Sequence, residues 1–228
     1  MATWKIYRYL FLVVVLGAAL GACTLMYPKG YNPSNFAPPT SAEPLPLVTA
    51  PSEIAALLRK GGYVIYMRHG LTRYDQLELE KRHREAGTFS FANCETQRAL
   101  SHEGHEQLRL AGASFRKLNL SLDRTYSSLY CRAIDSAKYF VDNAIATDML
   151  SNEGQVGLNP ENKPRTLAFL SHVPAPGKNI YMMAHGGIFW EATSFTVREG
   201  HAVVLDPKNL TVIVARIAPE EWADLVMR

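Results

Sequence analysis

From Pro51 onward, short apolar segments alternate with longer amphipathic ones, and this alternation constrains the fold more than any other feature of the sequence. The apolar run 63–67 is rich in β-branched and aromatic residues, which is typical of a buried strand. Segment 103–117 instead has the apolar spacing of an amphipathic helix. Strands that alternate with helices are joined by crossovers, which favour parallel strands covered by helices on both faces. We therefore expect an α/β fold, a three-layer sandwich with a mostly parallel central sheet.

The individual elements follow from the same change of periodicity along the chain. Ser52 is the expected cap of the first helix, and Gly61-Gly62 is its stop signal. The expected strands are 63–67, 122–127, 179–184, 201–205 and 211–217. The expected helices are 52–60, 103–117, 132–141, 165–170 and 187–195.

The N-terminal region has the charge and hydropathy pattern of a bacterial export signal. Lys5 and Arg8 precede an uncharged apolar stretch, 10–20, which is followed by Gly21-Ala22-Cys23. The run Leu20-Gly21-Ala22-Cys23 resembles a lipobox, where lipoprotein precursors receive a lipid on the cysteine and are cut just before it. We expect residues 1–22 to be a lipoprotein signal peptide and Cys23 to be the lipidation site.

The alternative is an uncleaved membrane-spanning helix, because no charge occurs from Tyr9 to Tyr27. Both interpretations place the rest of the chain outside the cytoplasm, tethered to a membrane. Thr24 stands where an aspartate typically retains Gram-negative lipoproteins in the inner membrane. The expected location is therefore the bacterial cell envelope, on the outer membrane and facing the periplasm.

Residues 23–50 lack the composition of a folded core. Seven of the thirteen prolines lie between Pro28 and Pro51, and no periodic apolar pattern accompanies them. Such a segment is typical of an extended spacer. We expect 23–50 to be a lipid-anchored, proline-rich linker and 51–228 to be the folded domain.

Charge and cysteine content exclude several classes of protein. The chain has 24 Lys+Arg against 21 Asp+Glu, and its first fifty residues hold Lys5, Arg8 and Lys29 against Glu43 alone. The folded part is thus nearly neutral, so no nucleic-acid partner is expected. The one basic cluster, 81–84, is interpreted as a solvated face. Three cysteines are too few for a disulfide-built mini-protein, and 47% hydrophobic residues are too many for a disordered chain.

Polar residues with phosphate chemistry follow three of the expected strands. They are Arg68-His69-Gly70, Ser127-Ser128 with Arg132 four positions on, and His185-Gly186-Gly187. Ligands of α/β sheets bind at the carboxyl ends of strands. Arginine presents a planar fork of donors that matches phosphate oxygens, and a neutral imidazole can accept a phosphoryl group. Two arginines and two histidines are therefore expected to converge on one anion.

These three blocks resemble the signature of the histidine phosphatase superfamily, also called the phosphoglycerate mutase-like family. Tyr66-Met67-Arg68-His69-Gly70 matches its first block, Ser128 to Ala133 is similar to the second, and Ala184-His185-Gly186 to the third. The resemblance covers roughly 62–228. It implies the fold of that family, with His69 as the nucleophile that forms a phosphohistidine and with Arg68, Arg132 and His185 completing the phosphate pocket. It also implies no metal and no cofactor.

A looser resemblance points to a bacterial, often exported, branch that includes lipopolysaccharide core phosphatases. It depends on two segments, 94–101 and 176–179. The chain departs from the common family pattern at Leu71, where many members have glutamate. It also has Gly186 where another branch has its catalytic aspartate.

The general acid that protonates the leaving alcohol is left open by the sequence. In the segment after the second block, alignment places either Asn152 or Glu153 at the key position. Glu199, near the start of a later strand, and Asp148 are the other candidates, and a site without such an acid is the remaining alternative. Proton transfer contributes roughly a hundred- to ten-thousandfold in rate.

Two cysteines remain once Cys23 is assigned to lipid. In an oxidising compartment, a disulfide between Cys94 and Cys131 is expected, and it would brace the segment that carries Arg132. A catalytic thiol at Cys131 is disfavoured, because a Cys-x5-Arg loop needs five intervening residues and Arg132 follows immediately.

The sequence therefore predicts a metal-independent phosphomonoester hydrolase, anchored to the membrane through Cys23 and acting on a small phosphorylated substrate through His69. Envelope sugar phosphates and a broad range of phosphomonoesters are both open as substrates. The alternative is a non-catalytic surface lipoprotein that binds phosphate or phosphorylated glycan.

Overall fold

The computed structural model describes residues 46–151 and 162–227, all within one compact unit, Pro38–Arg228. The expected signal peptide, Cys23 and nearly all of the expected linker lie outside the described residues, as do Asn152 and Glu153. Within the described part of the chain, every helix is too short or too polar to cross a bilayer.

A six-stranded sheet forms the middle layer, in the order β3-β2-β4-β1-β5-β6. Strands β1, β2, β3 and β4 run parallel to one another, whereas β5 pairs antiparallel with β1 and with β6. The expected mostly parallel sheet is thus confirmed. The strands are β1 (Val64–Arg68), β2 (Leu122–Ser128), β3 (Ile145–Thr147), β4 (Asn179–Ala184), β5 (Ala202–Leu205) and β6 (Ala215–Ile217).

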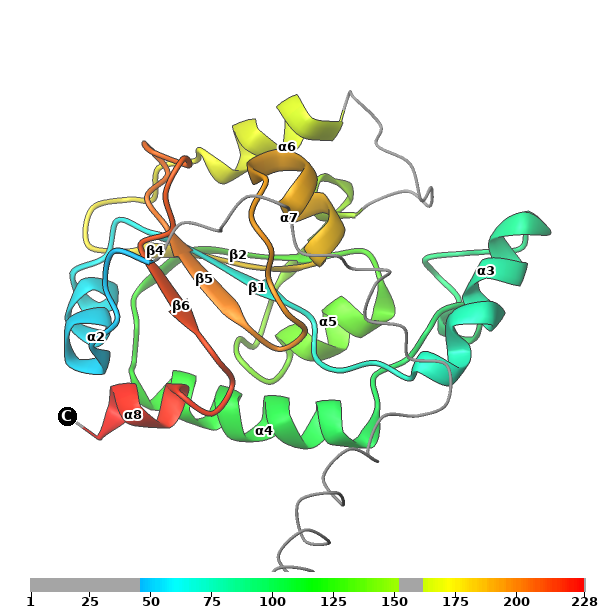
Figure 1. Ribbon diagram of the computed structural model, residues 1–228, viewed down its shortest axis with the longest axis horizontal. Coiled ribbons are helices and arrows are strands. Elements are labelled where there is room, and N and C mark those ends of the chain that lie inside the picture. The colour runs from blue at the N-terminus through cyan, green and yellow to red at the C-terminus, as the bar shows by residue number, and fades with distance from the viewer. Residues whose placement is uncertain (1–45, 152–161, 228) are drawn as a thin grey trace, which may run out of the picture. The chain divides into compact units, whose positions relative to one another are not determined.

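Helices cover both faces of this sheet (Figure 1). Side chains of one face pack with α2 (Pro51–Lys60), α4 (His102–Lys117), α5 (Cys131–Ala137) and α8 (Trp222–Val226). The other face packs with α6 (Asn162–Leu170) and α7 (Gly186–Thr193). Side chains of strand β1 alternate between the two faces. Ile65 and Met67 enter the first core, while Val64 and Tyr66 enter the second. This alternation of period two buries the central strand on both sides.

Helix α3 (Leu77–Glu85) covers neither face of the sheet and lies to one side of it (Figure 1). It has no buried residue, so polar contacts must hold it in place. Three short 3₁₀ turns complete the described structure: η2 (Tyr74–Gln76), η3 (Cys94–Thr96) and η4 (Asp148–Leu150).

Several local expectations were wrong. Ser52 does not cap α2, because the helix begins at Pro51 with Ala50 as its N-cap and no side-chain cap. Proline is favoured at the first helical position because its fixed φ already suits a helix and the amide hydrogen that it lacks would have no partner within the helix. Helix α5 ends at Ala137, short of the expected 141, and the strand expected at 211–217 forms only at Ala215–Ile217. The chain also forms α3, β3 and α8, which the periodicity did not indicate.

Candidate active site

The three polar blocks meet because the strands that carry them are parallel neighbours. Strand β4 lies between β1 and β2 and pairs parallel with both. Arg68 is the last residue of β1, Ser128 is the last of β2, and His185 directly follows β4. Their side chains therefore reach the same edge of the sheet, where the N-terminus of α5 brings Arg132.

His69 has one nitrogen protonated and the other available as a base. Its Nδ1 lies 2.9 Å from the carbonyl oxygen of Gly70, and a carbonyl only accepts hydrogen bonds. Nδ1 therefore carries the proton, and Nε2 carries a lone pair to which Arg132 Nε donates at 3.3 Å. The residue is 2% exposed. Burial, followed by the charge of Arg132, lowers the pKa of His69 well below its usual value, so the ring is neutral.

His185 is oriented by a chain of hydroxyl groups. Ser151 Oγ donates to the carbonyl of Thr147 at 2.9 Å, which uses its only hydrogen. At the 3.0 Å contact between the two serines, Ser128 must then donate to Ser151. Toward His185 Nε2, at 2.8 Å, Ser128 is therefore the acceptor, and Nε2 carries the proton. The ring centroids of His185 and His69 are 5.1 Å apart.

The His185 ring is also buried and neutral. Burial, followed by the charges of Arg132 and Arg68, lowers the pKa of His185 well below its usual value. Two neutral imidazoles beside several arginines form a positively charged edge of the sheet without a charge on either ring. Such an edge favours an anion while leaving Nε2 of His69 unprotonated.

A buried carboxylate fixes Arg68. Arg68 Nη2 donates to Glu199 Oε1 at 2.9 Å, and Nη1 donates to the carbonyl of Val197 at 3.2 Å. Glu199 is 5% exposed and also accepts from the amide and hydroxyl of Thr72 and from the hydroxyl of Tyr74. The sequence placed Glu199 among the proton donors; its contacts are those of an acceptor that positions Arg68.

Helix α3 supplies a second carboxylate that the sequence analysis did not single out. Glu80 Oε2 accepts from Arg132 Nη1 and from the amide of Arg98, both at 2.9 Å. Its other oxygen accepts from Arg84 at 3.2 Å. Although burial opposes it, the charge of Arg132 and these donors lower the pKa of Glu80. Each of Arg68 and Arg132 thus has its own carboxylate partner.

Part of the basic cluster 81–84 is not the solvated face that the sequence suggested. Lys81 and Arg82 are exposed, but Arg84 is half-buried, lies 3.6 Å from the ring centre of Phe89 and donates to the Tyr130 hydroxyl. Periodicity could not reveal this, because α3 has no apolar face to indicate which side meets the domain.

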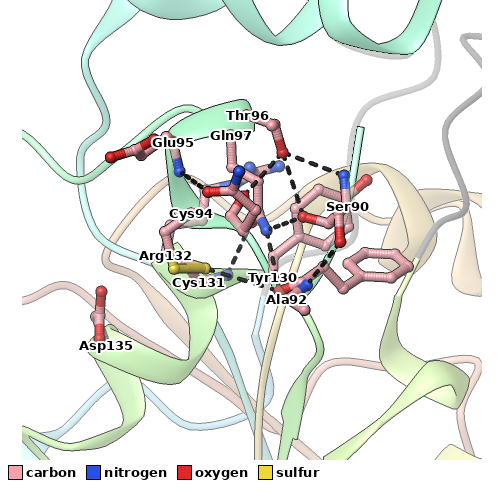
Figure 2. Close-up of a disulfide and its surroundings, with 12 residues drawn as sticks. Ser90, Ala92, Cys94, Glu95, Thr96, Gln97, Tyr130, Cys131, Arg132 and Asp135 are labelled. Carbon is pink, nitrogen blue, oxygen red and sulfur yellow. Dashed lines mark hydrogen bonds between the residues drawn. A yellow bond between two sulfur atoms is a disulfide. The ribbon is translucent and has the colours of Figure 1, made fainter. Parts of the chain in front are cut away.

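A disulfide joins the segment after α3 to the helix that carries Arg132. Cys94 and Cys131 are bonded, with their Cα atoms 5.7 Å apart. Figure 2 shows Gln97 beside this bond, where its Oε1 accepts from the amide of Cys131 at 2.9 Å. Gln97 also donates to the carbonyl of Ser90 at 2.9 Å. The segment that includes Arg98 is therefore fastened to the start of α5.

Of the three candidate acids, only Glu199 has side-chain contacts with this site among the described residues. Asp148 is exposed on η4 and pairs with Arg165 at 3.1 Å. Glu153 lies outside the described residues. Ser151, the last described residue before that gap, contacts the site through Ser128.

Comparison with known proteins finds similar proteins only among solved structures. No protein-family model matches the sequence, and no curated protein does. Among solved structures, the protein histidine phosphatase SixA complexed with tungstate is 17% identical, with 69% of this chain and 97% of that chain covered and a TM-score of 0.46. The chain is similar in structure to a histidine phosphatase.

Two further solved structures are similar to a comparable extent. The protein TTHB049 from Thermus thermophilus is 18% identical, over 68% of this chain and 99% of that one, with a TM-score of 0.46. The open reading frame Rv3214 from Mycobacterium tuberculosis is 14% identical, over 63% and 90%, with a TM-score of 0.45. Identities this low do not carry the role of any side chain from those proteins to this one.

Proposed function

We propose that the domain hydrolyses phosphomonoesters through a phosphohistidine formed on His69. The observation that carries this proposal is the state of the His69 ring. Its Nδ1 proton is fixed by the Gly70 carbonyl, so the Nε2 lone pair is available, and Arg132 stands beside that atom. A buried neutral imidazole between arginines has the protonation state that nucleophilic attack on phosphorus requires.

In the first step, His69 Nε2 attacks phosphorus, an N–P bond forms, and the P–O bond to the alcohol breaks. Arg68 and Arg132 bind the phosphoryl oxygens, and His185, whose Nε2 proton is held by Ser128, completes the pocket beside them. The carboxylates of Glu199 and Glu80 hold the two guanidinium groups in place before substrate arrives. Such preorganisation is the main source of catalysis in phosphoryl transfer. In the second step, water attacks phosphorus, the N–P bond breaks and inorganic phosphate leaves.

We assign the proton for the leaving alcohol to Glu153. Asp148 is engaged on the surface, and Glu199 already accepts from Arg68, Thr72 and Tyr74. Glu153 follows Ser151 by two positions in the sequence, and the Ser151 hydroxyl reaches the site. For Glu153→Gln we expect hydrolysis of an alkyl phosphate to fall about a hundredfold or more, and that of an aryl phosphate, whose leaving group needs no proton, to fall much less. Equal losses on both substrates would contradict the assignment.

Hydrolysis of p-nitrophenyl phosphate by the fragment 46–228 tests the nucleophile. His69→Ala should abolish turnover, and acid quenching of the parent protein with labelled substrate should trap an acid-labile phosphoprotein that the variant lacks. His172→Ala is the matched control, because His172 is exposed. Equal rates in parent and His69→Ala would refute the mechanism.

The same experiment separates catalysis from simple binding. Binding of vanadate by the parent protein, with no turnover and no trapped phosphoprotein, would favour the non-catalytic phosphate-binding lipoprotein instead. If turnover is found, a panel of envelope sugar phosphates set against simple aryl and alkyl phosphates would decide between a dedicated substrate and broad specificity.

We further propose that the protein is a lipoprotein of the bacterial envelope, anchored through Cys23 and facing the periplasm from the outer membrane. The lipobox-like run before Cys23 supports this location. The Cys94–Cys131 bond supports an oxidising compartment as well, because cytoplasmic thiols are normally kept reduced.

A further inference from the structure

We infer that Arg98 is a third phosphate-binding arginine, which adds its side-chain donors to those of Arg68 and Arg132. The family resemblance assigns two arginines to the pocket and gives Arg98 no role. The inference rests on the proposed phosphate site, and it concerns a residue that follows the disulfide-bonded Cys94 by four positions.

Position is the first argument. Arg98 Nη2 lies 3.7 Å from Glu199 Oε1, the same oxygen to which Arg68 Nη2 donates at 2.9 Å. The backbone amide of Arg98 donates to Glu80, which is the partner of Arg132. Arg98 therefore stands between the carboxylates that hold the other two arginines.

The electrostatic effect of Arg98 places it near the reacting groups as well. Its charge is among the causes that lower the pKa values of His69 and of His185, and it also lowers the pKa of Arg132. A charge that acts on the nucleophile, on the second histidine and on Arg132 lies close enough to act on an anion bound among them.

An unused donor is the second argument. Arg98 Nε is buried and has no hydrogen-bond partner among the described residues. The side chain is only 12% exposed, so water does not readily replace the missing acceptor. A buried guanidinium N–H without an acceptor costs free energy, and proteins rarely retain one without a reason. A phosphate oxygen would supply the acceptor.

The charge of the site matches one phosphate group. Among the described residues, the charged side chains joined around the two histidines are four arginines and two carboxylates, namely Arg68, Arg84, Arg98, Arg132, Glu80 and Glu199. With both histidines neutral, these six described side chains have a net charge of +2. A phosphomonoester dianion balances this charge, whereas a diester balances only half of it. Arg98 thus completes the preference for monoesters.

Calorimetric binding of inorganic phosphate to Arg98→Gln and Arg98→Lys tests this inference. We expect Arg98→Gln to weaken binding about ten- to a hundredfold, since a hydrogen bond between charged groups is lost together with one charge. Arg98→Lys should recover only part of the affinity, because lysine keeps the charge but has no Nε donor of the same geometry. Arg73→Gln is the matched control: Arg73 lies nearby in the fold, but it is exposed and pairs with exposed Asp75.

Thermal unfolding without phosphate shows whether each variant is folded. If Arg98→Gln does not fold, Arg98→Lys carries the test. A folded Arg98 variant that binds phosphate as tightly as the parent overturns the inference. If the parent binds phosphate through Arg98 but hydrolyses no ester, the inference stands and the proposed function fails.

Discussion

Burial of two uncharged histidines makes the stability of this domain sensitive to mild acid. The pKa values of His69 and His185 lie well below their usual value in the folded chain, chiefly because of burial. In the unfolded chain each returns to about 6.5. The unfolded state therefore binds more protons below this pH, and the contribution of each histidine, fully present above about pH 6.5, is lost as the pH falls toward the folded value.

Urea unfolding between about pH 5 and 7.5 measures this effect. We expect the free energy of unfolding to fall with acid by up to about 1.4 kcal/mol per histidine for each pH unit below 6.5. His69→Asn should reduce the slope, whereas His172→Asn, at an exposed position, should leave it unchanged. A slope that is unaffected by His69→Asn would show that other groups govern the acid sensitivity.

The hydroxyl of Ser128 has a distinct role from that of its neighbour Ser127. Ser128 Oγ accepts from His185 Nε2, whereas Ser127 Oγ donates to a backbone carbonyl, and both side chains are buried. Ser128→Ala leaves the Nε2 proton without its acceptor and frees the ring to rotate. We expect kcat/KM for an aryl phosphate to fall about tenfold, equivalent to one neutral hydrogen bond.

Ser127→Ala is the control for this substitution. It removes a buried hydroxyl of the same size without touching His185, so its effect should appear in stability and not in kcat/KM. Equal losses of kcat/KM in the two variants would mean that Ser128 has no special role in positioning the ring.

At the scale of elements, the disulfide connects catalysis to the segment around η3. Cys94 is exposed, so small thiols reach the bond, while Cys131 begins α5 directly before Arg132. Reduction should free the segment that carries Gln97 and Arg98. The closed loop spans a sequence separation of 37 residues. Its loss should cost about 2–4 kcal/mol of stability.

Unfolding and phosphate binding, measured with and without dithiothreitol, test this expectation. Reduction should lower both the free energy of unfolding and the phosphate affinity of the parent protein. The double variant Cys94→Ser, Cys131→Ser should have a lower stability and a lower phosphate affinity even without reductant. Dithiothreitol should change neither value, which controls for unrelated effects of the thiol. A parent protein whose phosphate affinity survives reduction would mean that Gln97 alone holds the segment in place.

The strands that carry the site residues could be predicted because their burial requires runs of apolar residues, which can be recognised in the sequence. Strand β4 is buried throughout and was bounded correctly at 179–184, and the alternation of strands with helices indicated parallel neighbours. Helix α3 could not be predicted, because it buries no residue and is held by Glu80 and Arg84 through contacts distant in sequence. Local periodicity carries no information about such contacts. For the same reason Glu80 and Arg98 were not anticipated.

At the scale of the whole molecule, the net charge of the chain does not account for anion binding by the domain. The excess of basic residues belongs mostly to the first fifty residues, and the domain is nearly neutral. Three of its arginines, Arg68, Arg98 and Arg132, lie beside the two histidines or the carboxylate that holds Arg68. Such a protein does not attract polyanions over its whole surface.

Lipid attachment is the last prediction, and it separates the two ways in which the N-terminal segment could tether the domain. Expressed in a Gram-negative host fed an alkyne-tagged fatty acid, the full chain should incorporate the label at Cys23 and fractionate with the outer membrane. Cys23→Ser should lose the label. Cys94→Ser, which removes a different cysteine, should keep it.

Membrane fractionation alone would not decide the question. An unprocessed chain keeps the apolar stretch 10–20 and stays membrane-bound without lipid. The mass of the mature chain is therefore needed as well. A lipoprotein loses residues 1–22 and gains acyl chains, whereas an uncleaved anchor keeps its full length and takes no label. Full length without label in the parent protein would replace the lipid anchor with a membrane-spanning helix and leave the proposed chemistry of the domain unchanged.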